Sequence, residues 1–296
     1  MEDKISSLCI LDDYDSVQTY LKNNLNLSRS FLKKNKLPKT ILEKKINKRD
    51  RIDLPLSILN NGLINPKYIG PEIKIIFEDS NFLVISKPCK SHSHPLDYKD
   101  RNNCLSFLRE NLVSNSILNV NINKYDRGLL YRLDYETSGL LILTKKDIIL
   151  ESYRLKSMTN HLKEYIAIVY GKPPLKFKYK HEFEYKGVKK NKAFLKEIKG
   201  KDQSGMIGTL LGERILYNER KNVALIKLNL IEGLRHQIRA QLFHENFQIL
   251  GEKLYTNNLN EDLSRLYLHA YRYSFTLDGK NYEFVDNNID SFKEFF

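Results

Sequence analysis

The sequence predicts an α+β fold, with a mixed, mostly antiparallel sheet and a small helical module in front of it. Short β-rich segments, several of them alternating apolar and polar residues, recur from Ile73 onwards. Helical segments lie between them in an order that does not repeat as strict β-α-β units, which favours a mixed sheet. The chain has 296 residues, and this length can bury a large core without disulfides.

The N-terminal segment predicts a small, basic, helical module. Residues 16–34 carry apolar side chains at helical spacing, and Ser28 is a suitable N-cap for a second short helix with Phe31 and Leu32. Lys33–Arg51 holds nine basic and two acidic residues. The following residues, NNGLINPKYIGP, have the composition of a loop. We therefore expect an RNA-binding module over residues 1–62 and a catalytic domain over residues 70–296.

The elements of the larger domain are expected in a mixed order. Lys172–Asn222 is rich in Lys and Gly, has weak periodicity and is expected to form peripheral hairpins and loops. Helices are expected at Asn102–Leu112, Ile148–Leu162 and Arg235–His244. Strands are expected at Ile73–Phe77, Phe82–Ser86, Leu140–Lys145, Tyr165–Tyr170, Val223–Leu230 and Leu266–Thr276.

Composition limits the classes of function. The formal charge of +13 indicates a polyanionic partner. A mean hydropathy of −0.48 and the absence of any apolar run near the ~20 residues of a membrane helix exclude a membrane-embedded protein. Three cysteines without a CxxC pair favour a reducing compartment, for which we expect the cytoplasm. The CKSHSH segment fits no common zinc pattern, and we expect no metal and no cofactor.

The segment YRLDYETSGLLILTKK is the first candidate site, because a polar loop is followed there by an apolar strand. Asp134 stands two residues from Arg132, so a neighbouring cation can favour the ionised carboxylate that a nucleophile or base requires. The local pattern is equally typical of a turn in which Asp134 and Thr137 cap backbone groups.

The segment EGLRHQIRAQL is the second candidate site. A helix over these residues would place Arg235 and Arg239 on one face, at positions i and i+4. Two guanidinium groups are easier to hold together when an anion lies between or beyond them. A solvated basic helix face explains the same spacing.

Several segments, in order, resemble the RluA-type pseudouridine synthases. YRLDYETSGLLILTKK is similar to the HRLD-x-x-TSG-LLLLAK segment of that family, KEYIAIVYG to its K-x-Y-x-A-x-V-x-G strand, and EGLRHQIRAQL to its TGR-T-HQIR-x-HL helix. FEDSNFLVISKPCKSHSHP, LGEKLY and LYLHAYRYSF resemble further family segments, so that the resemblance covers about Glu72 to Thr276.

The resemblance implies an enzyme that isomerises uridine in RNA without a cofactor. It assigns Asp134 as the catalytic aspartate, Tyr165 as the active-site tyrosine and Arg239 as the arginine that pairs with the aspartate. Arg132 would fill the space left by a uridine flipped out of the RNA. The sequence departs from the family pattern at four positions: Tyr131, Leu234, Arg235 and Gln241.

We expect RNA contacts from Arg132 and from the residues next to the candidate helix, Arg235 and His236. NLSRSFLKK and INKRDRIDLP resemble, more weakly, parts of the alpha-L RNA-binding domain. Phosphate contacts are therefore also expected from the N-terminal basic cluster, which we define as Lys44, Lys45, Lys48 and Arg49.

The expected partner is ribosomal RNA, with transfer RNA as the alternative, and the expected state is a monomer away from membranes. Two other functions fit parts of the sequence. One is a non-catalytic RNA-binding or ribosome-assembly protein on the same scaffold. The other is a nuclease or glycosidase that pairs Asp134 with Glu136.

Overall fold

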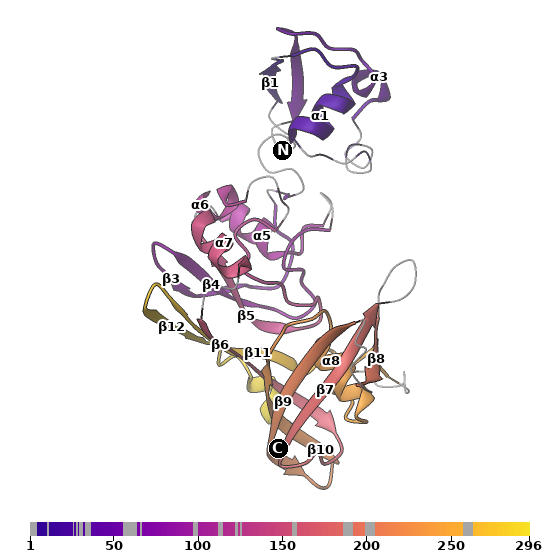
Figure 1. Cartoon of the computed structure of the whole chain (residues 1–296), viewed down its shortest axis with the longest axis vertical. Coiled ribbons are helices and arrows are strands. Elements are labelled where there is room, and N and C mark those ends of the chain that lie inside the picture. Colours follow the sequence, from indigo (N-terminus) through magenta and orange to yellow (C-terminus); the bar gives the residue numbers. More distant parts are fainter. Residues whose placement is uncertain are drawn as a thin grey trace.

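The structure is a computed structural model of the whole chain. It describes residues 5–10, 12–25, 27, 29, 32, 37–55, 64–65, 67–96, 100–111, 115–121, 124, 126–155, 159–185, 192–198, 205–256 and 263–296. Its architecture is α+β, as the sequence predicts (Figure 1). No helix in these ranges is both long enough and apolar enough to cross a membrane.

The N-terminal unit combines two helices with a small sheet. Strand β1 (Ile5–Cys9) pairs antiparallel with β2 (Arg51–Pro55), and helices α1 (Val17–Leu25) and α3 (Lys39–Leu42) lie between them in sequence. The predicted first helix is confirmed. The second, with Ser28 and Phe31, lies largely outside the described residues. Because this unit has its own buried cluster, including Val17, Leu21 and Ile46, its core does not depend on the larger sheet.

The boundary between residues 62 and 70 stays a prediction, as does the alpha-L assignment of the N-terminal unit. Most of the residues from 56 to 66 lie outside the described ranges. The small sheet includes the RIDLP segment that the weaker resemblance singled out, but a strand in that segment is compatible with many small folds.

The larger part of the chain is built on a ten-stranded sheet in the order β3-β4-β5-β11-β6-β10-β9-β7-β8, with β12 also paired to β11. All its strand pairs are antiparallel except β11 with β5. The strands are β3 (Lys74–Glu78), β4 (Phe82–Lys87), β5 (Ser138–Thr144), β6 (Thr159–Tyr170), β7 (Lys176–Tyr185), β8 (Ala193–Glu197), β9 (Met206–Asn218), β10 (Val223–Leu230), β11 (Leu268–Leu277) and β12 (Lys280–Val285).

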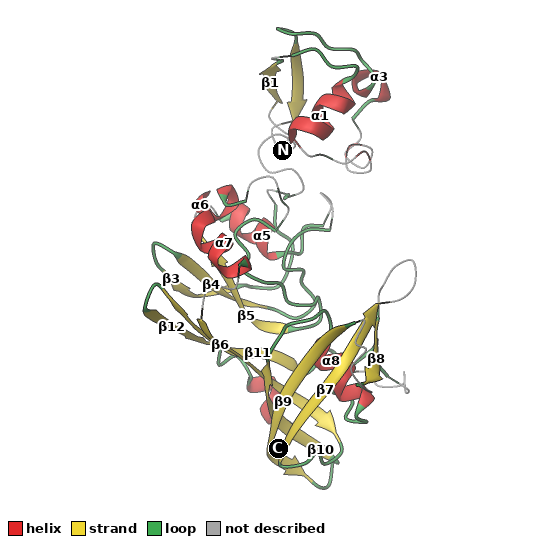
Figure 2. Cartoon of the chain, in the orientation of Figure 1, coloured by secondary structure: helices red, strands yellow, loops and turns green. Residues whose placement is uncertain are grey.

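Helices pack against this sheet at two places (Figure 2). One group, at the β3–β5 end, consists of α5 (Cys104–Glu110), α6 (Asn115–Asn119) and α7 (Asp147–Arg154). Helix α8 (Gln237–His244) packs against β7 and β8, where Phe183, Ala193 and Ala240 share a buried cluster. A short helix, α9 (Asp290–Lys293), follows the last strand.

The parallel contact between β5 and β11 requires a glycine. Gly139 pairs with Ala270 and has a φ of +113°. A Cβ atom on Gly139 would lie 2.3 Å from the carbonyl oxygen of Ala270. Because only glycine permits this backbone and this approach, the TSG sequence fixes the start of β5 directly after the loop that carries Asp134.

Two sequence-based expectations need correction. The helix expected at Ile148–Leu162 ends at Arg154, because residues from Thr159 onwards pair with β11 and extend β6. Hydrogen bonding to a neighbouring strand outweighs the local helical pattern there. The region Lys172–Asn222 does form hairpins at the edge of the sheet, but β7 and β9 are long strands of the main sheet rather than loops.

Candidate active site

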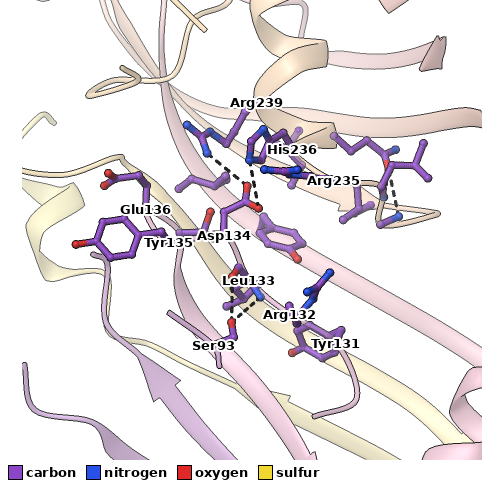
Figure 3. Close-up of a pocket in the computed structure, with 18 of the residues that line it drawn as sticks. Ser93, Tyr131, Arg132, Leu133, Asp134, Tyr135, Glu136, Arg235, His236 and Arg239 are labelled. Atoms are coloured by element: carbon purple, nitrogen blue, oxygen red, sulfur yellow. Dashed lines mark hydrogen bonds and ion pairs between the residues drawn. The ribbon is translucent and has the colours of Figure 1, made fainter. Parts of the chain in front are cut away.

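A cleft of about 760 Å³ contains most of the residues that the sequence singled out. Its walls come from the loop 131–137, from β6, from the end of β10 and from the residues that lead into α8. Asp134, Tyr165 and Arg239 all line it, although they are far apart in the sequence. The fold therefore brings the three expected catalytic residues to one surface (Figure 3).

Asp134 faces two basic side chains from the α8 region. Its Oδ2 lies 3.5 Å from Nη1 of Arg239, and its Oδ1 lies 3.8 Å from Nε2 of His236. The Asp134 side chain is 27% exposed, so a bound molecule can still reach its carboxylate. Glu136 projects away from this carboxylate (Figure 3), which does not favour a paired-carboxylate mechanism.

Arg239 is held mainly by a residue that the sequence motifs did not single out. Glu252 accepts hydrogen bonds from Nε and Nη2 of Arg239, both at 2.6 Å. Burial lowers the pKa of Arg239, but Glu252 and then Asp134 raise it overall. Burial likewise raises the pKa of Glu252, while Arg239 lowers it below its usual value. The planar fork of Arg239 therefore binds Glu252, and its remaining nitrogen faces Asp134.

Glu252 is itself fixed by the backbone. Its Oε1 accepts N–H groups from Leu254 at 2.7 Å and from Tyr255 at 3.2 Å. The LGEKLY segment, which resembles the family's LGD-x-LY, was the sequence signal that could have identified this glutamate. A carboxylate with its lone pairs occupied in this way holds the guanidinium rigidly.

Tyr165 lies on β6 between β10 and β11, opposite Leu228 and Ala270. The residue is 8% exposed and lines the cleft beside the loop that carries Asp134. Burial raises the pKa of its phenol, and the negative charge of Asp134 raises it further. The phenol therefore stays protonated at neutral pH and can stack on a base or donate a hydrogen bond.

Two residues of the KPCKSHS segment hold the Asp134 loop from below. The Ser93 hydroxyl donates to the Leu133 carbonyl and accepts the Leu133 N–H, both at 3.0 Å. The buried Lys87 ammonium donates to the carbonyls of Ser91 at 2.8 Å and Tyr135 at 3.4 Å. Burial lowers the pKa of Lys87 to about 8, although nearby acidic groups oppose this shift. The backbone on both sides of Asp134 is therefore anchored.

Arg132 is exposed on the other side of the same loop. Its Nη1 donates to Nε2 of His94 at 3.0 Å, and both residues line the cleft. Burial lowers the pKa of His94, with the positive charge of Arg132 acting in the same direction. A neutral imidazole can accept this hydrogen bond and so hold the guanidinium over the cleft.

Arg235 and Arg239 do not share a helix face, contrary to the expected geometry. Helix α8 begins at Gln237, and His236 before it has a left-handed backbone with a φ of 56°. This break leaves Arg235 exposed while Arg239 is buried. His236 turns toward Asp134 and contacts the Tyr255 hydroxyl through Nδ1 at 3.1 Å. Arg235, His236 and Arg239 all line the cleft, but with different surroundings.

Two departures from the family pattern have structural roles. The Tyr131 hydroxyl donates to the Leu140 carbonyl at 2.9 Å. The buried Gln241 amide donates to the Gly208 carbonyl at 3.0 Å. Both side chains hold neighbouring strands and are directed away from the Asp134 carboxylate.

The N-terminal basic cluster lies between α3 and β2, and all four of its side chains are exposed. The backbone N–H of Lys48 donates to Asp13 at 2.8 Å, which fixes this turn. The cluster is not among the residues that line the cleft. Its assignment as a phosphate-binding surface stays a prediction.

Comparison with known proteins agrees with this fold and cleft. A human protein named RNA Pseudouridylate Synthase Domain Containing 1 superimposes with a TM-score of 0.59 at 17% identity, over 74% of this chain and 87% of that one. A second human protein, RNA Pseudouridylate Synthase Domain Containing 4, gives a TM-score of 0.53 at 20% identity, over 72% of this chain and 87% of the other. These likenesses identify the fold as that of pseudouridylate synthases.

Sequence comparison identifies the family. Residues 81–244 match the model of the RNA pseudouridylate synthase family. Ribosomal large subunit pseudouridine synthase D of Borreliella burgdorferi is 32% identical over 213 residues, which cover 71% of this chain and 62% of that protein. An uncharacterized RNA pseudouridine synthase of Mycoplasma genitalium is 28% identical over 73% of this chain and 67% of the relative.

The chain belongs to the RNA pseudouridylate synthase family. The resemblance noted in the sequence is thereby confirmed, and the class of enzyme is an RNA pseudouridine synthase, an isomerase.

Proposed function

We propose that this chain isomerises uridine in ribosomal RNA, with the Asp134 carboxylate acting on the ribose. The observation that carries the proposal is the position of Asp134 in an open cleft, facing the buried Arg239 and His236. Isomerisation must break the bond from N1 of uracil to the ribose and rejoin the base through C5. An ionised carboxylate can either add to the sugar or remove its 2′ proton, and both routes require the charge that these neighbours favour.

The other groups of the cleft fit the same reaction. Tyr165 would contact the released base, because its ring lies beside Asp134 and its phenol stays protonated. Uridine in structured RNA is stacked, so the reacting nucleotide must leave the stack to reach the carboxylate. Arg132, which His94 holds at the cleft, would occupy the space that the nucleotide leaves.

The choice of RNA rests on the relatives. Relatives from Borreliella burgdorferi and Buchnera aphidicola are named ribosomal large subunit pseudouridine synthases D and C. We therefore propose ribosomal RNA rather than transfer RNA, and the cytoplasm as the compartment. We also propose that the enzyme acts as a monomer, which light scattering of the purified chain would test.

The decisive experiment replaces Asp134 by asparagine. The change removes only two long contacts, of 3.5 and 3.8 Å, while Arg239 keeps its fork on Glu252, so we expect the protein to fold. Single-turnover pseudouridine formation on large-subunit ribosomal RNA transcripts should be abolished, and RNA affinity should stay within a few-fold because phosphate contacts dominate it.

Glu136→Gln is the matched control, because it changes the neighbouring carboxylate that projects away from Asp134. We expect this variant to keep its activity. Retained turnover in a folded Asp134→Asn variant would refute the catalytic assignment. RNA cleavage or base release that depends on Glu136 would favour a nuclease or glycosidase instead.

A further inference from the structure

Four side chains with metal-binding atoms converge at the C-terminal end of α8, away from the Asp134 contacts. His181 comes from β7, Glu197 ends β8, His244 ends α8, and Glu245 follows it. One nitrogen or carboxylate oxygen from each of them lies within 4.8 Å of the others. We call these four residues the β7–α8 cluster. The proposed reaction at Asp134 makes no use of them.

The sheet register explains why two of these residues meet. His181 and Glu197 are direct partners in the antiparallel pair of β7 and β8, so their side chains leave the sheet on the same side. Helix α8 packs over that side and adds its last residue (Figure 1). Three different elements therefore contribute to one small volume.

The separations suit a tetrahedral metal ion. Nε2 of His181 lies 3.0 Å from Oε1 of Glu245 and 3.9 Å from Oε1 of Glu197. Nε2 of His244 lies 3.4 Å from the same Glu197 oxygen. Ligands at ~2.0–2.1 Å from a zinc ion at a tetrahedral centre lie about 3.3 Å apart. Two imidazoles and two carboxylates form a donor set that zinc accepts.

The surroundings also favour a cation. The cluster lies at the C-terminal end of α8, where the helix dipole is negative. His181 is 2% exposed and Glu197 is 66% exposed, so one ligand is rigidly placed and another leaves an entry path open. A bound dication would offset the charges of the two carboxylates at this end of the helix.

A buried amide lies behind His181. Nε2 of Gln241 lies 3.2 Å from Nδ1 of His181, and Oε1 of Gln241 has no hydrogen-bond partner among the described residues. Binding of a metal at Nε2 requires the imidazole proton on Nδ1. A half-turn of the amide would present Oε1 to that proton, at the cost of the donor to Gly208, and give the second contact usual for a metal-bound histidine.

We propose that the β7–α8 cluster binds one Zn²⁺ ion and that this ion joins the β7–β8 hairpin to helix α8. The opposite end of the same helix carries His236 and Arg239, which face Asp134. The ion would therefore stabilise the position of the helix rather than enter the reaction. This departs from the sequence-based expectation of no metal.

The test uses the full chain, free of any affinity tag and stripped with a chelator. Titration with Zn²⁺ against a chromophoric chelator should show one tight site. At a free Zn²⁺ concentration about 100 times the Kd, the thermal midpoint should rise by about 5 to 10 °C. Both readouts are independent of pseudouridine formation.

Glu197→Gln and His244→Gln are suitable ligand variants, because both side chains are largely accessible and the fold does not depend on them. Each should weaken Zn²⁺ binding by at least about 10- to 100-fold and abolish the thermal shift. Glu219→Gln, the same change at an exposed carboxylate of the β9–β10 turn, should bind as the wild type does. Absence of a stoichiometric site, or zinc binding that survives both ligand variants, would overturn the proposal.

Discussion

Replacing Glu252 by glutamine tests how the cleft holds its arginine. In the structure Oε1 of Glu252 accepts Nη2 of Arg239 and two backbone N–H groups, while Oε2 accepts only Nε of Arg239. A glutamine can keep its oxygen at the first position. Its NH₂ group then faces the Nε–H of Arg239, so one charge-assisted hydrogen bond is replaced by a contact between two donors.

The expected loss of stability depends on the burial of this pair. Removing one partner of a buried ion pair typically costs about 3–5 kcal/mol, because the other charge is left without compensation. Here the glutamine oxygen keeps part of the bonding, and Asp134 remains near Arg239 as a second anion. We therefore expect a smaller loss, of about 2–3 kcal/mol, which corresponds to a fall of roughly 5–10 °C in Tm.

Activity should fall more than stability. Without its fork on Glu252, the Arg239 guanidinium can move toward Asp134 and change the orientation of the reacting carboxylate. A displacement of about 1 Å at a reacting group can cost about 100-fold in rate. We expect single-turnover pseudouridine formation to drop by about 10- to 100-fold, with RNA affinity nearly unchanged.

The assays are a thermal melt and single-turnover kinetics on the same preparation, with Glu219→Gln as the control for an exposed glutamate. A Glu252→Gln protein with wild-type stability and wild-type turnover would refute both roles, because the buried pair would then be neither stabilising nor positioning. A loss of stability without a loss of rate would retain the structural role of Glu252 and remove the positioning role.

Three further changes have defined outcomes. Arg239→Lys should lose most of the turnover, because one ammonium cannot hold both Glu252 oxygens and face Asp134; equal rates for the variant and the wild type would contradict this. Burial lowers the pKa of His236 below its ordinary 6.5, with Asp134 opposing this shift. The unfolded chain then takes up more protons, so stability should decline as the pH falls below about 6.5, and His236→Gln should reduce that decline in melts between about pH 5 and 8. Neutralising the N-terminal basic cluster should lower the log–log salt slope of RNA binding by about 0.7 to 0.9 for each phosphate that it no longer binds, and an unchanged slope would mean that these side chains are only solvated: Lys44, Lys45, Lys48 and Arg49.

The local sequence was sufficient for most elements of the sheet. Val223–Leu230 was predicted with the bounds that the structure has, and the alternation of buried and exposed residues along it shows why. Thr159–Leu162 was predicted as helix because its local pattern resembles that of α7, but it extends β6 along β11. The partner strand lies more than 100 residues away, so no local pattern contains that information.

Sequence motifs alone were enough to identify the family and, through the segments that resemble it, to select Asp134, Tyr165 and Arg239. The surroundings of these residues became visible only in the folded chain. The fold places Glu252 on the fork of Arg239, Ser93 beneath the Asp134 loop, and a left-handed His236 between Arg235 and the helix. The physical reason is range: a segment's own pattern specifies its conformation, whereas contact between side chains distant along the chain depends on how the strands pair and the helices pack.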